Sequence, residues 1–415
     1  MYRIRTCVWA LLLAYFALAN AQDSLTLKES ITLVLQENTE LLAADLAHQA
    51  AEYSPAARSA IPDPAFMIEG RGIPLDASRF GETREIMFML EQMFPFPGTL
   101  THQHQAGEWE AKIAEQMYRA AQNNLTAMTK TVYYEIAFYD AALSINLTHI
   151  QLMHDFYDIA KAKYIVNQAR QQDLFRITIE RSRLQAKQLE LEEQRSNAQK
   201  QLNQLLRRPL LSDVTVAPLP EETMTMSSIA VDSLLLKFHP ALKSAEIRLA
   251  ARDTDIRIAR DTNKPDFRVM GGYMAMNDRD DALMGRLSMT LPFMPWSNKD
   301  SHAQIQQAKI LKNKQEMDWV TLRDRLLVKA QSLSTTLQSQ KERLHVYETE
   351  ILPTSRQAVD LALADYQTGR EDLLSLIEYE RELLNNELEW LNLRKNIWQT
   401  FADLENAVGT TLEKR

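Results

Sequence analysis

The chain has 415 residues and is acidic, with 47 lysines and arginines against 55 aspartates and glutamates, a net charge of −8. An acidic chain is a poor nucleic-acid binder, so we expect no nucleic-acid partner. Cys7 is the only cysteine, which excludes an internal disulfide and a cysteine metal site.

Residues 1–21 have the pattern of a secretory signal peptide. Arg3 and Arg5 precede an uncharged run from Cys7 to Ala19, and Ala19-Asn20-Ala21 ends it with small residues. The run is shorter than the roughly 20 residues that a membrane-spanning helix needs, so cleavage is favoured over anchoring. The expected mature chain begins near Gln22 and has no N-terminal cysteine to carry a lipid.

The remainder of the sequence is one unit repeated twice, at 22–217 and 229–415, with a linker at 218–228 that contains Pro218-Leu219-Pro220. Several residues of the first copy align with residues of the second. The aligned pairs are Leu41 with Leu242, Ala44 with Ala245, Pro64 with Pro265, Gly70 with Gly271, and Phe94-Pro95-Phe96 with Leu291-Pro292-Phe293.

Each copy is expected to contain two strands of membrane-barrel length, at about 64–72 and 84–94 and at about 265–276 and 284–293. Ile86, Phe88 and Leu90 alternate with Glu85, Met87, Met89 and Glu91, while Leu287, Met289 and Leu291 alternate with Arg286, Ser288 and Thr290. Four strands cannot close a membrane barrel, so several chains are required, and eight, twelve or sixteen strands all remain possible.

Long helices are expected at about 99–208 and 298–408, with a shorter one at about 26–59. Apolar residues recur there at spacings of three and four, as in Val132, Ile136, Tyr139 and Leu143. The fold class is therefore mainly α with a β-barrel part. The helices alone would also fit a soluble periplasmic coiled-coil adaptor, which would lack the paired strands.

In this order the elements resemble the TolC-like outer membrane efflux protein family, nearest its heavy-metal (CzcC/CusC-like) branch. The stretches that carry the resemblance are Ile61-Pro62-Asp63-Pro64, Gln92-Met93-Phe94-Pro95-Phe96-Pro97-Gly98, Tyr164 through Asp173-Leu174, and Tyr366-Gln367-Thr368-Gly369 through Asp372-Leu373-Leu374. The resemblance covers nearly the whole mature chain.

The resemblance implies a homotrimer in the outer membrane, with a barrel continuous with long periplasmic helices, and a periplasmic adaptor and an inner-membrane RND-type pump as partners. It places an aperture and adaptor tip at the turns between the long and returning helices, at Tyr164, Asn167, Asp173, Tyr366, Gly369, Arg370, Glu371 and Asp372. The chain departs from the family at Asn167, usually a glycine, and at Thr99, often a basic residue in the metal branch. Many relatives are also lipoproteins, whereas the expected mature chain has no N-terminal cysteine to carry a lipid.

Two aspartates at these turns have two possible roles. In a symmetric channel, Asp173 and Asp372 would form carboxylate rings that favour cations. Alternatively, they cap the helices that follow them. The resemblance makes heavy-metal cations, and hence metal resistance, the first expectation for cargo, with drug efflux or protein secretion as alternatives.

Neither an enzyme nor a cofactor is expected, because the sequence has no phosphate-binding glycine loop, nucleophile elbow or HExxH motif. The pair His102 and His104 has no third ligand nearby in sequence, so a solvated helix start is favoured over metal binding. The 17 methionines, among them Met270, Met274, Met276 and Met284, could ligate a soft metal, but packing is the favoured explanation.

Overall fold

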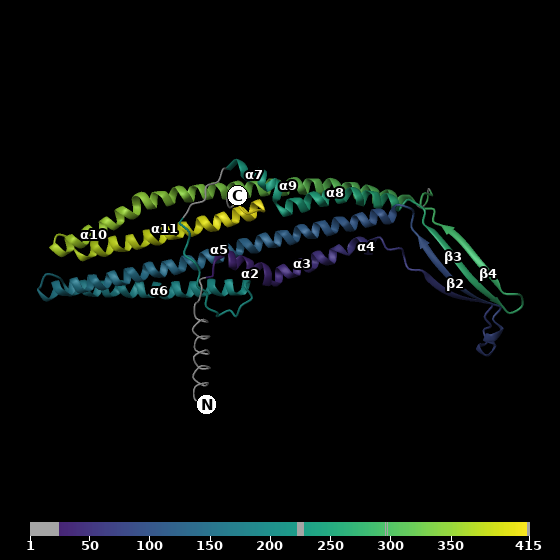
Figure 1. Ribbon diagram of the computed structural model, residues 1–415, viewed down its shortest axis with the longest axis horizontal. Helices are drawn as coiled ribbons and strands as arrows, with labels where there is room; N and C mark the ends of the chain where they lie inside the picture. The colour runs from purple at the N-terminus through teal and green to yellow at the C-terminus, as the bar shows by residue number, and fades with distance from the viewer. Residues whose placement is uncertain (1–24, 222–227, 295, 297, 413–415) are drawn as a thin grey trace, which may run out of the picture. The chain divides into compact units, whose positions relative to one another are not determined.

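The computed structural model describes residues 25–221, 228–294, 296 and 298–412. The predicted signal peptide at 1–21 lies outside these residues, as do residues 222–227 of the predicted linker. The chain divides into two compact units. Figure 1 labels helices and strands along the ribbon. The first unit combines the segment up to Leu42 with Ala121–His239 and Leu326–Arg415, and the second unit combines Ala43–Ala120 with Pro240–Arg325.

Most of the described residues are helical, and four strands form the only sheet among them, so the predicted fold class is confirmed. The helices are α2 (Leu27–Glu37), α3 (Thr39–Glu52), α4 (Ser54–Arg58), η1 (Ala77–Glu82), α5 (Thr99–Ile165), α6 (Gln171–Leu205), α7 (Ser228–Phe238), α8 (Pro240–Asp261), α9 (Asn298–Val346), η2 (Tyr347–Ile351), α10 (Leu352–Thr368) and α11 (Leu373–Val408). No described helix combines the length and the apolar character needed to cross a membrane.

The helix expected at 26–59 is broken into α2, α3 and α4. Thr26 and Glu29 form a capping box at the start of α2, and Asn38 ends it with extended backbone angles. The Asn38 side chain then accepts a hydrogen bond from the Glu40 backbone N–H at 2.9 Å, which caps α3. Asparagine therefore ends one helix and begins the next, a role that apolar spacing does not reveal.

The last long helical stretch is interrupted by η2, a π-helical turn between α9 and α10. Pro353 follows it and occupies the first turn of α10. Because proline has no backbone N–H, it cannot continue the ordinary helical hydrogen-bond ladder, and the local change of pitch accommodates it.

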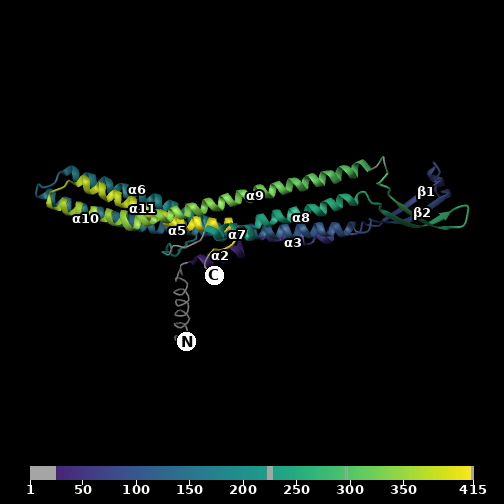
Figure 2. The same cartoon turned by 90° about the horizontal axis from the view of Figure 1, so that it is seen from above.

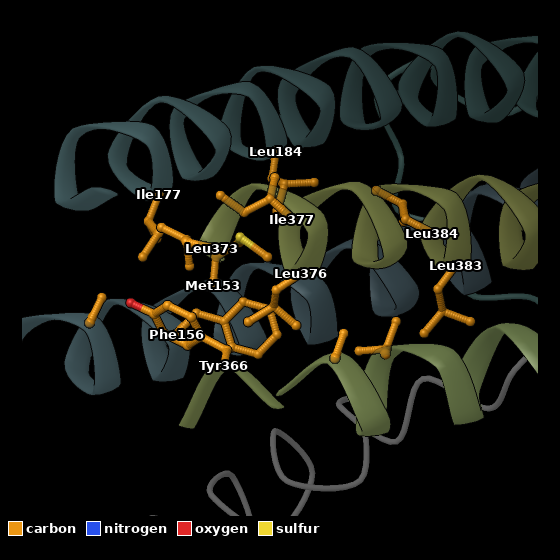
Figure 3. Packing of buried hydrophobic residues seen from close by; sticks show 13 residues of the cluster. Met153, Phe156, Ile177, Leu184, Tyr366, Leu373, Leu376, Ile377, Leu383 and Leu384 are labelled. Atoms are coloured by element: carbon orange, nitrogen blue, oxygen red, sulfur yellow. The ribbon is translucent and has the colours of Figure 1, made fainter. Parts of the chain in front are cut away.

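The core of the first unit lies between helices from both sequence repeats. Met153 and Phe156 of α5 and Ile177 of α6 pack with Leu373 and Leu376 of α11, and all five are at most 2% exposed. Figure 3 shows these side chains converging from the facing helices. Neither repeat therefore buries its own apolar stripe alone in this unit.

The sheet lies in the second unit and has the antiparallel order β1-β2-β3-β4. Figure 2 labels its first two strands. Its strands are β1 (Ala65–Arg71), β2 (Glu85–Phe94), β3 (Phe267–Met276) and β4 (Ala282–Met289). The strand expected to reach residue 293 ends at Met289, shortly before Pro292, which has no N–H for the ladder.

The register gives the sheet two unlike faces, because directly paired residues share a face. One face, here called the apolar face, carries Phe66, Ile68, Ile86, Phe88, Leu90, Phe94, Phe267, Val269, Tyr273, Leu283, Leu287 and Met289, with Gln92 as its polar exception. The other face, here called the methionine face, carries Met67, Met87, Met89, Met93, Met270, Met274, Met276 and Met284 together with Glu69, Arg71, Glu85, Glu91, Arg268, Arg286 and Ser288.

Candidate functional site at the two interhelical turns

The first turn joins α5 to α6 through a left-handed residue. Asn167 has φ 58°, and its backbone N–H donates to the Tyr164 carbonyl at 3.0 Å. The Gln168 N–H donates to the Lys163 carbonyl at 2.8 Å, which satisfies another carbonyl at the end of α5. Asparagine tolerates this backbone region better than most residues, so it serves in place of glycine.

The second turn, between α10 and α11, has the same design with glycine. Gly369 has φ 77°, and its N–H donates to the Tyr366 carbonyl at 3.1 Å. The Arg370 N–H donates to the Asp365 carbonyl at 2.9 Å. The Arg370 guanidinium also lies 3.6 Å from the Asp365 carboxylate, but this exposed pair contributes little to stability.

Asp372 is the N-cap residue of α11, whereas Asp173 lies in the first turn of α6 and bonds back to its N-cap residue, Arg170. The Asp173 carboxylate accepts from the Arg170 backbone N–H at 3.0 Å, and the Asp372 carboxylate accepts from the Ser375 N–H at 3.0 Å. The hydrogen bond from Ser375 lowers the pKa of Asp372, and the nearby charge of Arg176 lowers it further. The capping alternative is therefore correct for Asp372, whose lowered pKa keeps the carboxylate charged at neutral pH, while Asp173 supports the start of α6 through its hydrogen bond from Arg170.

The two turns line one hollow in the first unit, although they are far apart in sequence. Its lining includes five of the predicted residues, Asp173, Tyr366, Gly369, Glu371 and Asp372. Lys163, Arg170 and Arg176 also line it, so the hollow carries charges of both signs. Tyr164, Asn167 and Arg370 belong to the same turns but are exposed and do not line the hollow.

Tyr366 lines the hollow and also belongs to the core of the first unit. It is 4% exposed and packs among the apolar residues of the first unit (Figure 3). Burial, together with the charge of Asp173, raises the pKa of the Tyr366 phenol to about 12. Its hydroxyl has no hydrogen-bond partner among the described residues. The Lys163 ammonium lies 5.3 Å from the ring centroid and donates to the Gln367 carbonyl at 2.8 Å, which ties the two turns together.

Sequence reasoning missed a buried charge cluster between α5 and α11. His149 is 3% exposed and lies between two carboxylates, with Nδ1 2.6 Å from Glu380 and Nε2 3.0 Å from Glu387. Burial alone would lower the pKa of His149, but the two glutamates raise it to about 9. A signal was present, because Glu380 and Glu387 interrupt the apolar stripe of Leu376, Leu383 and neighbouring leucines.

The structure gives the two candidate metal-binding histidines carboxylate neighbours. His102 Nδ1 lies 2.7 Å from the carboxylate of Asp261, whose side chain is only 2% exposed. The expectation of a solvated helix start is therefore wrong for His102, because the fold brings α8 beside it. His104 is about half exposed and lies 3.5 Å from Glu108. Within the described ranges, no three histidine, aspartate or glutamate side chains are placed to hold a metal ion.

Comparisons with known proteins agree with this architecture. Residues 232–410 match the family model described as outer membrane efflux protein. No curated protein matches the chain by sequence. Efflux proteins are transport proteins, so this match agrees with the prediction that the chain is a transport protein and not an enzyme.

Solved structures resemble the described chain over most of its length. CusC, described as forming a transmembrane channel, is 16% identical with a TM-score of 0.80, and the match covers 92% of each chain. VceC of Vibrio cholerae is 17% identical with a TM-score of 0.77, covering 93% of this chain and 97% of VceC. The outer membrane channel MtrE of Neisseria gonorrhoeae is 19% identical with a TM-score of 0.78, covering 93% and 89%.

At these identities the likeness concerns the fold. It extends over both halves of the chain, whereas the family model covers the second half alone. Residues 232–410 thus match the outer membrane efflux protein model, and the chain has the fold of the TolC-like channels.

Proposed function

We propose that the chain is one subunit of a homotrimeric outer-membrane efflux channel with a long periplasmic extension. It is exported through a cleaved signal peptide and works as a passive duct. A periplasmic adaptor and an inner-membrane RND-type pump deliver the substrates.

The observation that carries this proposal is the exposed apolar face of the sheet. Phe66 is 64% exposed, Leu287 75% and Leu283 87%. Exposing a continuous apolar surface to water is unfavourable, so a surface of this kind indicates a site of interaction with protein or membrane. Lipid contacts suit a sheet whose strands alternate in this way, since membrane barrels place apolar residues outward and polar residues inward.

The edges of the sheet support assembly with further chains. Among the described strands, β1 pairs only with β2, and β4 pairs only with β3. Unpaired backbone groups are too costly to leave in a bilayer, so neighbouring copies must pair with both edges. Three copies of the four-stranded sheet would form a barrel of twelve strands. The number three comes from the family resemblance.

The proposed cargo is heavy-metal cations. Its support is the sequence resemblance to the CzcC/CusC-like branch alone. The fold does not favour one cargo, because the chain resembles VceC and MtrE as well as CusC. In the native host, deletion of the gene should lower tolerance of metal salts and leave drug tolerance unchanged. Loss of drug tolerance alone, or of a secreted protein, would replace the metal assignment with one of the alternatives.

Membrane fractionation tests the channel itself. The protein should co-sediment with the outer membrane, migrate differently in electrophoresis with and without heating, and cross-link to a trimer in intact cells. The soluble adaptor alternative predicts full recovery in the osmotic-shock fluid as a species without heat-modifiable migration, and that result would overturn the proposal.

A further inference from the structure

Methionines are distributed very unevenly between the two faces of the sheet. Of the methionines in its four strands, all except Met289 lie on the methionine face. The apolar face instead uses phenylalanine, leucine, isoleucine and valine. The methionines are therefore concentrated on the face that packs inward, where their thioether sulfurs come close together.

The fold brings several of these side chains into one cluster. Met67 is directly opposite Met89, and Met87 is directly opposite Met274. Opposed residues have Cβ atoms about 5 Å apart, within the reach of the flexible methionine side chain. Met87, Met89 and Met270 are 0%, 4% and 7% exposed, and Met67, Met274 and Met284 pack against them. The cluster therefore gathers thioethers from all four strands.

Gly272 makes room for this arrangement. It pairs with Met89 on one side and with Met284 on the other. A Cβ atom at position 272 would lie 2.9 Å from the Met89 Cγ and 2.7 Å from the Phe88 carbonyl oxygen. A side chain there would displace Met89, so the glycine keeps the thioethers of neighbouring strands together.

Two of the three glutamates on the same face lie beside arginines. Glu91 lies 3.9 Å from Arg268, and Glu69 lies 2.8 Å from Arg71. These ion pairs engage carboxylates that a hard cation would need as ligands. Thioethers, in contrast, are soft donors that select Cu(I) and similar ions over hard or borderline cations.

We infer that the methionine face binds a soft monovalent metal cation, Cu(I) or Ag(I), through thioethers of Met67, Met87, Met89, Met270, Met274 and Met284. Binding needs only the sheet. The location of the site on the lumen wall, as a contact for cargo in transit, rests on the proposed function. Loose thioether coordination suits such a role, since an ion must leave a conduction site as readily as it enters.

Silver binding tests the inference. Full-length protein is purified from the outer membrane in detergent, checked by mass spectrometry for loss of Cys7, and titrated calorimetrically with silver nitrate in chloride-free buffer. The test variant combines Met87→Leu, Met89→Leu and Met274→Leu, because leucine conserves the packing volume. Met289→Leu, on the apolar face, is the matched control.

The wild type and the Met289→Leu control should bind Ag⁺ alike, and the triple variant should bind at least about tenfold more weakly. Zinc titrations should not distinguish the three proteins. X-ray absorption of the wild type loaded with Cu(I) should show a sulfur-only ligand shell, a readout that needs no variant to assemble. Equal Ag⁺ affinity in an assembled triple variant, or a shell of nitrogen and oxygen, would overturn the inference.

Planar-bilayer currents separate this outcome from the fate of the channel proposal. If the protein binds silver through its methionines but forms no pores, the metal site stands and the channel proposal is overturned. If it forms normal pores but its silver binding does not depend on the methionines, the channel proposal stands and the metal site is overturned.

Discussion

Asp372 caps a helix and is also a candidate for lining the proposed aperture. Its carboxylate accepts from the Ser375 N–H, and its side chain is exposed beside the hollow between the two turns. A cap needs an oxygen acceptor, whereas a cation-favouring ring needs the negative charge. Substitutions that remove one property and keep the other therefore separate the two roles.

We predict that Asp372→Asn keeps the cap and that Asp372→Ala loses it at a cost of about 1 kcal/mol. If the carboxylate also lines the aperture, both variants will show higher conductance or weaker cation preference in planar bilayers. Thermal unfolding measures the cap, and current reversal potentials measure the selectivity. Unchanged currents in both folded variants would leave capping as the only role.

His149 contributes through charge buried between α5 and α11. The pKa is raised from 6.5 to about 9 in the folded state, so the stabilisation is complete below pH 6.5 and is lost as the pH rises through about 9. At neutral pH the shift corresponds to a stabilisation on the order of 3 kcal/mol.

His149→Gln should therefore lower the unfolding temperature of the protein substantially at pH 6 and much less at pH 10. Thermal melts across this range measure the difference. The control is His154→Gln, whose side chain is exposed near Asp158, and its effect should be small at every pH. A difference for His149→Gln that stays constant with pH would show that packing, not charge, stabilises this position.

Between elements, α4 and α5 approach so closely that only glycine fits at residue 107. A Cβ atom there would lie 2.5 Å from the Pro55 Cα and 2.7 Å from the Ser54 carbonyl carbon. Ser54 and Arg58 also hydrogen bond to the Glu110 carboxylate, which fixes α4 on this part of the helix. Backbone atoms cannot move aside as a flexible side chain can.

Gly107→Ala should destabilise the fold by about 1–3 kcal/mol through overpacking, although alanine normally favours a helix. Chemical denaturation measures the loss. Gly81→Ala is the control, because nothing lies within 4 Å of the Cβ position there. A stabilised Gly107→Ala variant would show that α4 is not held against the helix.

The two faces of β4 allow a direct test of the lipid contact. Leu287 lies on the apolar face and Ser288 on the methionine face. A charged side chain at a lipid-facing position in mid-membrane is destabilising, whereas a lumen position tolerates it. Leu287→Glu should reduce the heat-modifiable assembled fraction in the outer membrane, and Ser288→Glu, directly opposite Arg268, should leave it near the wild-type level. Equal assembly of the two variants would argue against lipid on the apolar face.

The compact units of the whole chain do not coincide with its sequence repeats. Each unit takes segments from both 22–217 and 229–415. In the first unit, helices α10 and α11 of the second repeat bury apolar side chains against α5 and α6 of the first. A single repeat would therefore expose its apolar stripe and would lack the partner that stabilises it.

We predict that residues 229–415, exported alone behind the native signal peptide, are degraded in the periplasm. Coexpression with residues 1–228 should restore a protease-resistant protein, because the two halves then supply every layer of the core. Immunoblots after limited proteolysis measure both outcomes. A stable second half on its own would show that the repeat is an independent folding unit.

The sequence by itself located the strands and the long helices, but it missed the breaks between α2, α3 and α4 and the turn η2. Period-two alternation located the strands, and low glycine and proline content indicated the long helices, because both signals are local. The turns were also readable, since Gly369 and Asp372 have the residue types that end and begin helices.

Only the tertiary structure decided which residues meet. Asp173 and Tyr366 come together at one hollow, His149 lies between Glu380 and Glu387, and methionines from four strands form one cluster. These contacts join segments far apart in the chain, so no local pattern specifies them. The sequence decided which faces are apolar, whereas strand register and helix packing decided which of them are buried and which are exposed.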